Sequence, residues 1–241
     1  MNTIDLIKSH VSVRDFEDKP LSDDIKHELV AAAQAGSSSN FVQGYRIIEI
    51  TDPDMREELA VLSNSAAYVR KTGTFYVFVA DLHTQARLLE EASLPTAGVE
   101  NLESLMVSIV DATIAGQNMA LAAESIGLGI CYIGGIRNDL KRVAQMLCLP
   151  KHTVPVFGLT VGYPASKNEV KPRKPMANVL HENRYVEEDL TAYNEQTAAY
   201  YAARGSNQQE TNWSMKMNDF FSVVRRPDVA DFVKSQGFKL D

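Results

Sequence analysis

The sequence has few of the residues that build disulfide scaffolds and metal centres. It contains two cysteines, Cys131 and Cys148, and their spacing matches no metal-binding motif. We expect both to be buried free thiols, which is typical of a reducing cytoplasm. The five histidines are scattered, and "HENRY" has Tyr185 where the H-E-x-x-H motif requires its second histidine. The sequence therefore predicts no metal site.

Positive charge and long apolar runs are also scarce. The formal net charge is −7, which argues against a nucleic-acid or membrane-surface protein but allows a local basic pocket for a small anion. Polar residues interrupt every apolar run well before the ~18 positions that a membrane span needs. The start, "MNTIDLIKSH", lacks the features of a secretory signal. We expect a cytoplasmic protein whose partners include neither nucleic acid nor membrane.

What the chain does have is an ordinary globular composition with clear periodic segments. Apolar residues at helical spacing predict helices over residues 3–9, 22–36, 53–63, 83–93, 100–125 and 137–148. Segments rich in β-branched and aromatic residues predict strands over residues 45–51, 74–81, 130–133 and 153–164. This order favours an α+β or three-layer domain with an extension over a doubly wound βαβ sheet.

The longest predicted helix and the C-terminal third differ from the rest. Residues 100–125 are apolar or small on nearly every side, which predicts burial in a core or a subunit interface. After Pro164 the chain is proline-rich and irregular, which indicates a long ordered loop or an extended arm. Three surface-type helices are then predicted over residues 187–203, 213–224 and 228–237. We expect one domain over residues 1–241, with 185–241 as its helical extension.

The stretch "GLGICYIGGIRND" contains two glycine pairs with different contexts. Gly127 and Gly129 follow a helix and precede a strand, the reverse of a dinucleotide-binding loop, so we interpret them as a helix C-cap. Gly134 and Gly135 follow a strand and precede a helix that we expect to start near residue 137. Either the turn needs positive φ, or no side chain blocks a flat ligand from reaching a glycine N–H. On the second interpretation, Gly135→Val leaves the fold intact and crowds the ligand.

Three polar segments could contribute to the same site. In "HVSVR", His10, Ser12 and Arg14 follow a period of two, which suits a phosphate, a ribityl chain and a polar ring edge in succession. In "VKPRKP", prolines stiffen the chain around Lys171 and Arg173, which could converge on one anion. "SSSN", residues 37–40, offers small donors after a helix. An ordinary solvated loop is the alternative for each segment.

Several segments, in order, resemble the FMN-dependent nitroreductase/flavin reductase family, in its longer NADPH-preferring branch. They are "HVSVRDF", "GSSSN", "AAESIGLGICYIGGIRN", "VFGLTVGYP", "VKPRKP", "HENRY" and "YYAARGSN". The resemblance implies an α+β, three-layer fold with a central mixed or antiparallel sheet and a C-terminal helical excursion. It further implies a homodimer with two FMN sites at the interface, in which the helix at 100–125 forms the dimer core.

The resemblance also assigns cofactor contacts. It implies that His10, Ser12 and Arg14 line the FMN, with Arg14 nearest the pyrimidine edge, and that Lys171 and Arg173 hold the phosphate. It implies that Ser38, Ser39 and Asn40 reach the phosphate from the partner subunit. Along the isoalloxazine it places Ile133, Gly134 and Gly135, with a glycine amide near N5. No side chain is implied as a catalytic acid or base, because the flavin carries the chemistry while Arg14 and Gly135 tune the ring.

Two positions depart from the family pattern. Arg204 resembles a residue that contacts the NADPH 2′-phosphate, but Gln208 and Gln209 stand where relatives often have basic residues. NADPH and NADH therefore both remain candidate cosubstrates. Ala66 stands where many relatives have a glutamine that contacts the flavin ring, and Tyr68 is the candidate replacement.

The function implied is reduction of quinones, nitroaromatics or free flavin, by ping-pong hydride transfer from NAD(P)H through flavin N5. The alternative is a flavin-binding sensor or storage protein with little turnover, because phosphate contacts fit both functions. Only a nicotinamide site, such as one around Arg204, distinguishes them.

Overall fold

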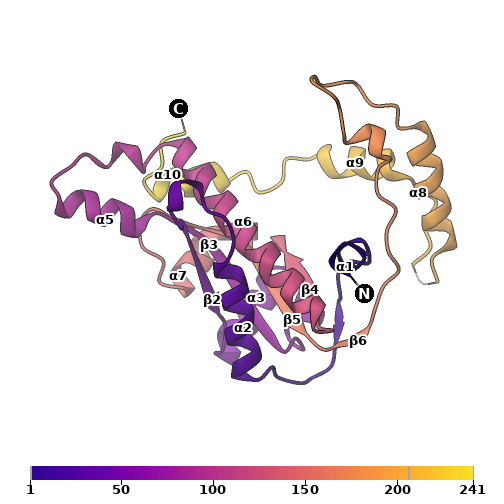
Figure 1. Ribbon diagram of the computed structural model, residues 1–241, viewed down its shortest axis with the longest axis horizontal. Coiled ribbons are helices and arrows are strands. Elements are labelled where there is room, and N and C mark those ends of the chain that lie inside the picture. Colours follow the sequence, from indigo (N-terminus) through magenta and orange to yellow (C-terminus); the bar gives the residue numbers. More distant parts are fainter. Residues whose placement is uncertain (1, 206, 241) are drawn as a thin grey trace. The chain divides into compact units, whose positions relative to one another are not determined.

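The computed structural model describes residues 2–205 and 207–240 (Figure 1). The chain forms two compact units. The larger unit comprises Met1–Asn168 and Arg226–Asp241, and the smaller unit comprises Glu169–Arg225. The prediction of a single domain over 1–241 stays a prediction.

A four-stranded sheet forms the centre of the larger unit. Its strands follow the order β2-β3-β5-β4, and each neighbouring pair is antiparallel. Their bounds are β2 Tyr45–Glu49, β3 Thr74–Asp81, β4 Gly129–Ile133 and β5 Thr153–Gly162. The two inner strands, β3 and β5, are almost wholly buried, which agrees with the nearly continuous apolar sequence of each. A second, two-stranded antiparallel sheet pairs β1 (Asp15–Phe16) with β6 (Pro164–Ser166).

Helices cover both faces of the four-stranded sheet and make the larger unit three-layered, as expected. The helices of this unit are α1 Thr3–Lys8, α2 Asp23–Gln34, α3 Pro53–Leu62, α4 Ala66–Val69, α5 His83–Glu91, α6 Leu102–Ser125, α7 Leu140–Met146 and α10 Val229–Ser235. Its short 3₁₀ helices are η1 Ser39–Phe41, η2 Thr96–Gly98 and η3 Gly134–Asn138. Because side chains alternate along β3, Tyr76 and Phe78 pack with α2 and α6, whereas Phe75 and Val77 pack with α3 and α7.

The start of α7 differs from the prediction. We expected a helix from about residue 137, but a 3₁₀ turn occupies 134–138 and α7 begins only at Leu140. The reason is a helix cap, because the Asp139 carboxylate accepts a hydrogen bond from the Arg142 amide. At α1, similarly, the cap is Asn2 rather than the expected Thr3.

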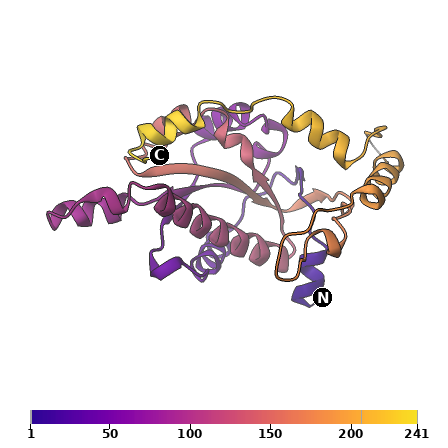
Figure 2. The same ribbon diagram turned by 90° about the horizontal axis from the view of Figure 1, so that it is seen from above.

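Helix α6 is both a core helix and a partly exposed one. Figure 2 shows it running along one face of the sheet, and its buried face includes Ala112, Ala115 and Met119. On its other side Met106 and Val110, at helical spacing, are 53% and 52% exposed. By length and mean hydropathy (1.3) α6 could cross a membrane, a property that core helices of soluble proteins share. The expectation of no membrane partner stays a prediction.

Two expectations about burial were wrong. Cys131 is buried as expected, but Cys148 is exposed, because it follows the end of α7 with a φ of 51° where the chain reverses. The third tail helix is not of a surface type. In α10, Phe232 and Val233 are buried in the core of the larger unit, and the Gln236 carbonyl accepts a hydrogen bond from the His152 amide. Seven residues are too few to show a reliable apolar period.

The smaller unit is mainly helical, with η4 Met176–Asn178, α8 Thr191–Ala203 and α9 Trp213–Phe221. Residues 167–175 and 179–190 contain neither helix nor strand, which agrees with the predicted ordered loop or arm. Helices α8 and α9 are joined by specific contacts. The Trp213 amide donates to the Thr197 hydroxyl (3.0 Å), and the rings of Tyr193 and Trp213 lie 5.9 Å apart.

Candidate functional site

The predicted site residues of the N-terminal segment lie beside the start of β4. The Val13 amide donates to the Ile130 carbonyl (2.9 Å), and the Val13 side chain is buried. The neighbouring side chains of Ser12 and Arg14 both reach the Cys131 thiol, as their period of two predicted. Burial raises the pKa of this thiol, while the Arg14 guanidinium and hydrogen bonds from Ser12 and Arg14 act in the opposite direction.

His10 has a different neighbour. Its Nδ1 atom lies 2.6 Å from Oε1 of Glu124, in the last turn of α6. The structure therefore brings Ser12 and Arg14 together at Cys131, and it joins His10 to α6. Sequence reasoning missed Glu124, although an acidic residue in an otherwise apolar helix was a visible signal.

Of the first two glycines, Gly127 has the expected role in a helix C-cap, whereas Gly129 begins β4. Gly127 follows the last turn of α6 with a φ of +87°, and the Leu128 amide donates to the Ala123 carbonyl, which completes a helix C-cap. Gly129 is required for a close approach, because a Cβ there would lie 2.5 Å from a Val13 methyl group.

The second glycine pair requires a correction. Neither Gly134 nor Gly135 has positive φ. A Cβ on Gly134 would meet nothing closer than the Arg137 guanidinium at 3.5 Å, so this position is open. A Cβ on Gly135 would lie 2.0 Å from the Ser63 carbonyl oxygen at the end of α3. The expectation that Gly135→Val leaves the fold intact is therefore wrong, since a backbone atom already occupies the space.

Around Gly134 the structure adds cations that sequence reasoning missed. Arg137 is half-buried and donates to the Val156 carbonyl. Burial lowers the pKa of Arg137, and the charge of Arg226 lowers it further. Arg226 in turn donates to Asn138 Oδ1 at 2.9 Å. In the described residues neither arginine forms an ion pair with a carboxylate.

Ile133 and Tyr68 contribute mainly to the core. The Ile133 side chain is buried in the cluster that packs beneath α3, so only its backbone can face a ligand. Tyr68, on α4, is half-buried and packs against the same cluster, as does Ala66.

The loop that contains Ser38, Ser39 and Asn40 is organised around a buried carboxylate, Asp111, in the middle of α6. Asp111 accepts hydrogen bonds from the Ser38 hydroxyl (2.6 Å) and from the amides of Ser39 (3.3 Å) and Gly44 (3.0 Å). The Ser38 hydroxyl has only one proton to donate, and it donates this proton in its hydrogen bond to Asp111. Ser39 and Asn40 are exposed and retain donors for a ligand.

Within the smaller unit, Lys171 and Arg173 flank Pro172 on an exposed segment. The Tyr193 hydroxyl donates to the Pro172 carbonyl (3.2 Å), and Arg173 donates to the Lys171 carbonyl (2.9 Å). The next cation, Lys174, is paired with Glu188 at 2.5 Å. Lys174 therefore has a structural partner, and it is not one of the two predicted phosphate ligands.

Arg204 lies at the C-terminal end of α8, one turn after Tyr201. Gln209, which follows it, connects α8 to a lysine of the next helix. Gln209 is tied back by its amide to the Tyr201 carbonyl (3.2 Å), and its side chain accepts from Lys216 Nζ at 2.6 Å. Lys216 also lies 4.9 Å from the centre of the Tyr201 ring. Sequence reasoning missed Lys216, because it belongs to the next helix.

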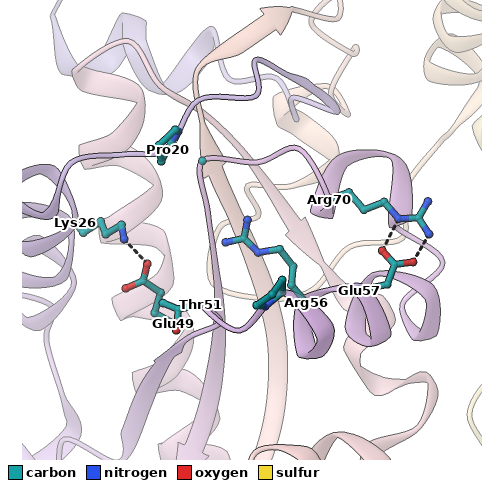
Figure 3. Close-up of a pocket in the computed structure, with 9 residues that line it drawn as sticks. Pro20, Lys26, Glu49, Thr51, Arg56, Glu57 and Arg70 are labelled. Carbon is teal, nitrogen blue, oxygen red and sulfur yellow. Dashed lines mark hydrogen bonds and ion pairs between the residues drawn. The ribbon is translucent and has the colours of Figure 1, made fainter.

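A pocket of about 400 Å³ lies elsewhere in the larger unit, between α2, α3 and the edge of the sheet (Figure 3). Lys26 pairs with Glu49 (2.8 Å), and Arg70 pairs with Glu57. The third cation, Arg56, donates to the carbonyls of Ile50, after the end of β2, and Thr72, before the start of β3. All three cations therefore have partners within the protein, and no residue predicted for the flavin site lines this described pocket.

Among the described residues, no cluster of three or more His, Cys, Asp or Glu side chains is placed to hold a metal ion. The absence of a metal site in the whole protein stays a prediction.

Comparison with known proteins identifies the family. The model of the nitroreductase family matches residues 7–163, and the model of the C-terminal domain of the nitroreductase family matches residues 171–241. The chain is 44% identical to an FMN reductase (NADPH) of Bacillus subtilis, over 98% of each chain. It is 41% identical to an oxygen-insensitive NADPH nitroreductase of Salmonella typhimurium, again over 98% of each chain.

A solved structure of a nitroreductase from B. subtilis has the same fold. It superimposes with a TM-score of 0.94 at 43% identity, covering 98% of this chain and 99% of that one. The resemblance proposed from the sequence motifs is confirmed over nearly the full length, and the chain belongs to the nitroreductase family.

Proposed function

We propose that this protein is an NADPH-dependent FMN oxidoreductase that reduces small acceptors such as nitroaromatics, quinones or free flavin. The observation that carries the proposal is its full-length similarity to an FMN reductase (NADPH), at 44% identity. The relatives' names support turnover rather than storage, since they include a nitroreductase and a Cr(VI) reductase.

The residues of the larger unit fit a flavin. Arg14 is exposed and, in the described residues, forms no ion pair with a carboxylate, so its charge is available to a ligand. Gly134 offers backbone with space beside it. A planar ring edge carrying negative charge suits this combination of a guanidinium and unobstructed amides. We assign Arg14 to the pyrimidine edge, His10 and Ser12 to the ribityl chain, and the backbone of 133–135 to the ring.

For the phosphate we assign Lys171 and Arg173, with Ser39 and Asn40 as donors from the partner subunit. The cations suit a dianion, and the Tyr193–Pro172 hydrogen bond supports their segment. Because the Ser38 proton is bonded to Asp111, we assign Ser38 to holding its loop rather than to donating to the phosphate.

FMN held by Arg14, Ser12 and the backbone of 133–135 would supply the hydride chemistry between a nicotinamide and an acceptor. The protein's own part is electrostatic and steric. Arg14 would stabilise negative charge on the reduced ring. We assign Arg204 and Lys216 to attracting the 2′-phosphate that distinguishes NADPH from NADH.

We further propose that the protein is a homodimer that works in the cytoplasm. The exposed apolar side chains of α6, Leu102, Met106 and Val110, lie on one stripe and suit a subunit interface. The cysteines are free thiols, which supports a reducing compartment.

Anaerobic stopped-flow at 450 nm tests the proposal. The protein reconstituted with FMN is mixed separately with NADPH and NADH, and rapid bleaching, faster with NADPH, is expected. A yellow protein that neither cosubstrate bleaches would support the sensor or storage alternative. A protein that does not take up FMN would contradict both functions.

A further inference from the structure

Glu124 makes a contact that the proposed function does not use. Its carboxylate lies 2.6 Å from Nδ1 of His10, and the two side chains are 11% and 31% exposed. Within residues 2–205 and 207–240 this is the only ion pair that Glu124 forms. The pair joins α6 to the segment that carries Ser12 and Arg14.

The location of Glu124 is unfavourable for the helix itself. It lies in the last turn of α6, a helix of 24 residues, where the helix dipole is negative and disfavours a carboxylate. Helix stability therefore does not explain Glu124, and removing its charge should not weaken the helix. The contact with His10 is the remaining structural consequence of this side chain.

The contact determines where the imidazole carries its proton. An ionised carboxylate can only accept hydrogen bonds, so the proton lies on Nδ1 of His10 whether the ring is neutral or charged. Nε2 is then the nitrogen that is available to a ligand. A ring without a partner at Nδ1 would exchange between two tautomers and would rotate more freely.

We propose that Glu124 is a positioning residue for the cofactor. It holds the His10 ring in one orientation with the proton on Nδ1, so that Nε2 can accept a hydrogen bond from a hydroxyl of the ribityl chain of FMN. This inference rests on the proposed function, because it needs His10 to line the flavin.

The other charged or titratable groups nearby do not replace Glu124. Tyr132, on β4, has its pKa raised by burial and further by the charge of Glu124, so it stays neutral. Lys167 lines the same pocket as Glu124, of about 410 Å³, but no ion pair joins them. Arg14, on the same segment as His10, reaches Cys131 instead.

The test combines a spectroscopic signature with a double-mutant cycle. The ¹⁵N shifts of the His10 ring are measured in the apoprotein, and the FMN dissociation constant is measured by quenching of flavin fluorescence. The variants are Glu124→Gln, His10→Ala and the double variant. Glu103→Gln is the matched control, since it removes the same charge from an exposed position in the first turn of α6.

We expect a protonated Nδ1 in the parent and mixed tautomers in Glu124→Gln. Losing this charge-assisted bond should weaken FMN binding about tenfold, with an unchanged or higher Tm. Glu103→Gln should bind FMN like the parent. Adding Glu124→Gln to His10→Ala should cause little further loss, because Glu124 acts through His10.

Other results would overturn the inference. One is an unchanged tautomer and affinity in Glu124→Gln. Another is a double variant whose loss of FMN affinity equals the product of the losses in Glu124→Gln and His10→Ala. Glu124 would then act independently of the His10 ring. If the parent itself does not bind FMN, the proposed function fails, and the apoprotein spectra show separately whether Glu124 controls the His10 tautomer.

Discussion

Gly135 allows a sharp test of why a glycine is present beside a predicted ligand. A Cβ at this position would lie 2.0 Å from the Ser63 carbonyl oxygen and 2.7 Å from its carbon. Overpacking a close-packed site costs about 1–3 kcal/mol, and a helix-end carbonyl cannot turn aside as a side chain can. We therefore expect Gly135→Ala to lower the free energy of unfolding by about 3 kcal/mol, or the Tm by roughly 6–12 °C at this chain length.

Gly134→Ala is the matched control, because its Cβ would meet only the end of Arg137, at 3.5 Å. We expect this variant to unfold within about 0.5 kcal/mol of the parent. Thermal unfolding of the three apoproteins at one protein concentration measures both effects without the cofactor's contribution. Equal Tm values for the two variants would refute the packing argument, and Gly135 would then have to be explained by the ligand alone.

Three further predictions concern the assigned contacts. Changing both Lys171 and Arg173 to alanine removes two charge-assisted hydrogen bonds. The loss of about 3–6 kcal/mol of binding free energy should weaken FMN binding by two to four decades. A double variant that purifies as yellow as the parent would contradict the phosphate assignment. Asp111→Asn should destabilise the protein by at least about 2 kcal/mol and speed hydrogen exchange in residues 38–44, because three hydrogen bonds lose a charged acceptor. Exchange in these residues as slow as in the parent would show that the loop does not depend on Asp111. Arg204→Ala and Lys216→Ala should each raise the KM for NADPH severalfold and leave that for NADH unchanged, and an equal effect on both cosubstrates would contradict a 2′-phosphate contact.

The elements of the larger unit could be predicted because their patterns are local. The strands Thr74–Asp81 and Thr153–Gly162 are long apolar runs, and the cap of α2 at Ser22 is a sequence signature. The exceptions are short or depend on distant residues. Helix α10 has only seven residues, and its burial is decided by contacts with a core built from distant segments such as β5 and α7.

The candidate site could be predicted only in part, for the same reason. A period of two was enough to bring Ser12 and Arg14 to one side. The sequence pattern could not show that Ser63 occupies the space beside Gly135, since the two residues are far apart in the chain. Nor could it show that the Ser38 proton is bonded to Asp111. Close approach and hydrogen-bond partners are long-range properties that residue types alone do not specify.

Helix α6 links these observations into one arrangement. Its two acidic side chains with partners in distant segments, Asp111 and Glu124, each hold a segment assigned to the flavin: the 38–44 loop and His10. Its exposed stripe, which includes Met106 and Val110, is the surface that we assign to the subunit interface. The same rigid helix would therefore set the position of both cofactor segments and of the partner subunit. Because Ser39 and Asn40 are assigned to the partner's phosphate, a shift of α6 in one subunit would move its own His10 and the donors that it supplies to the partner's site together.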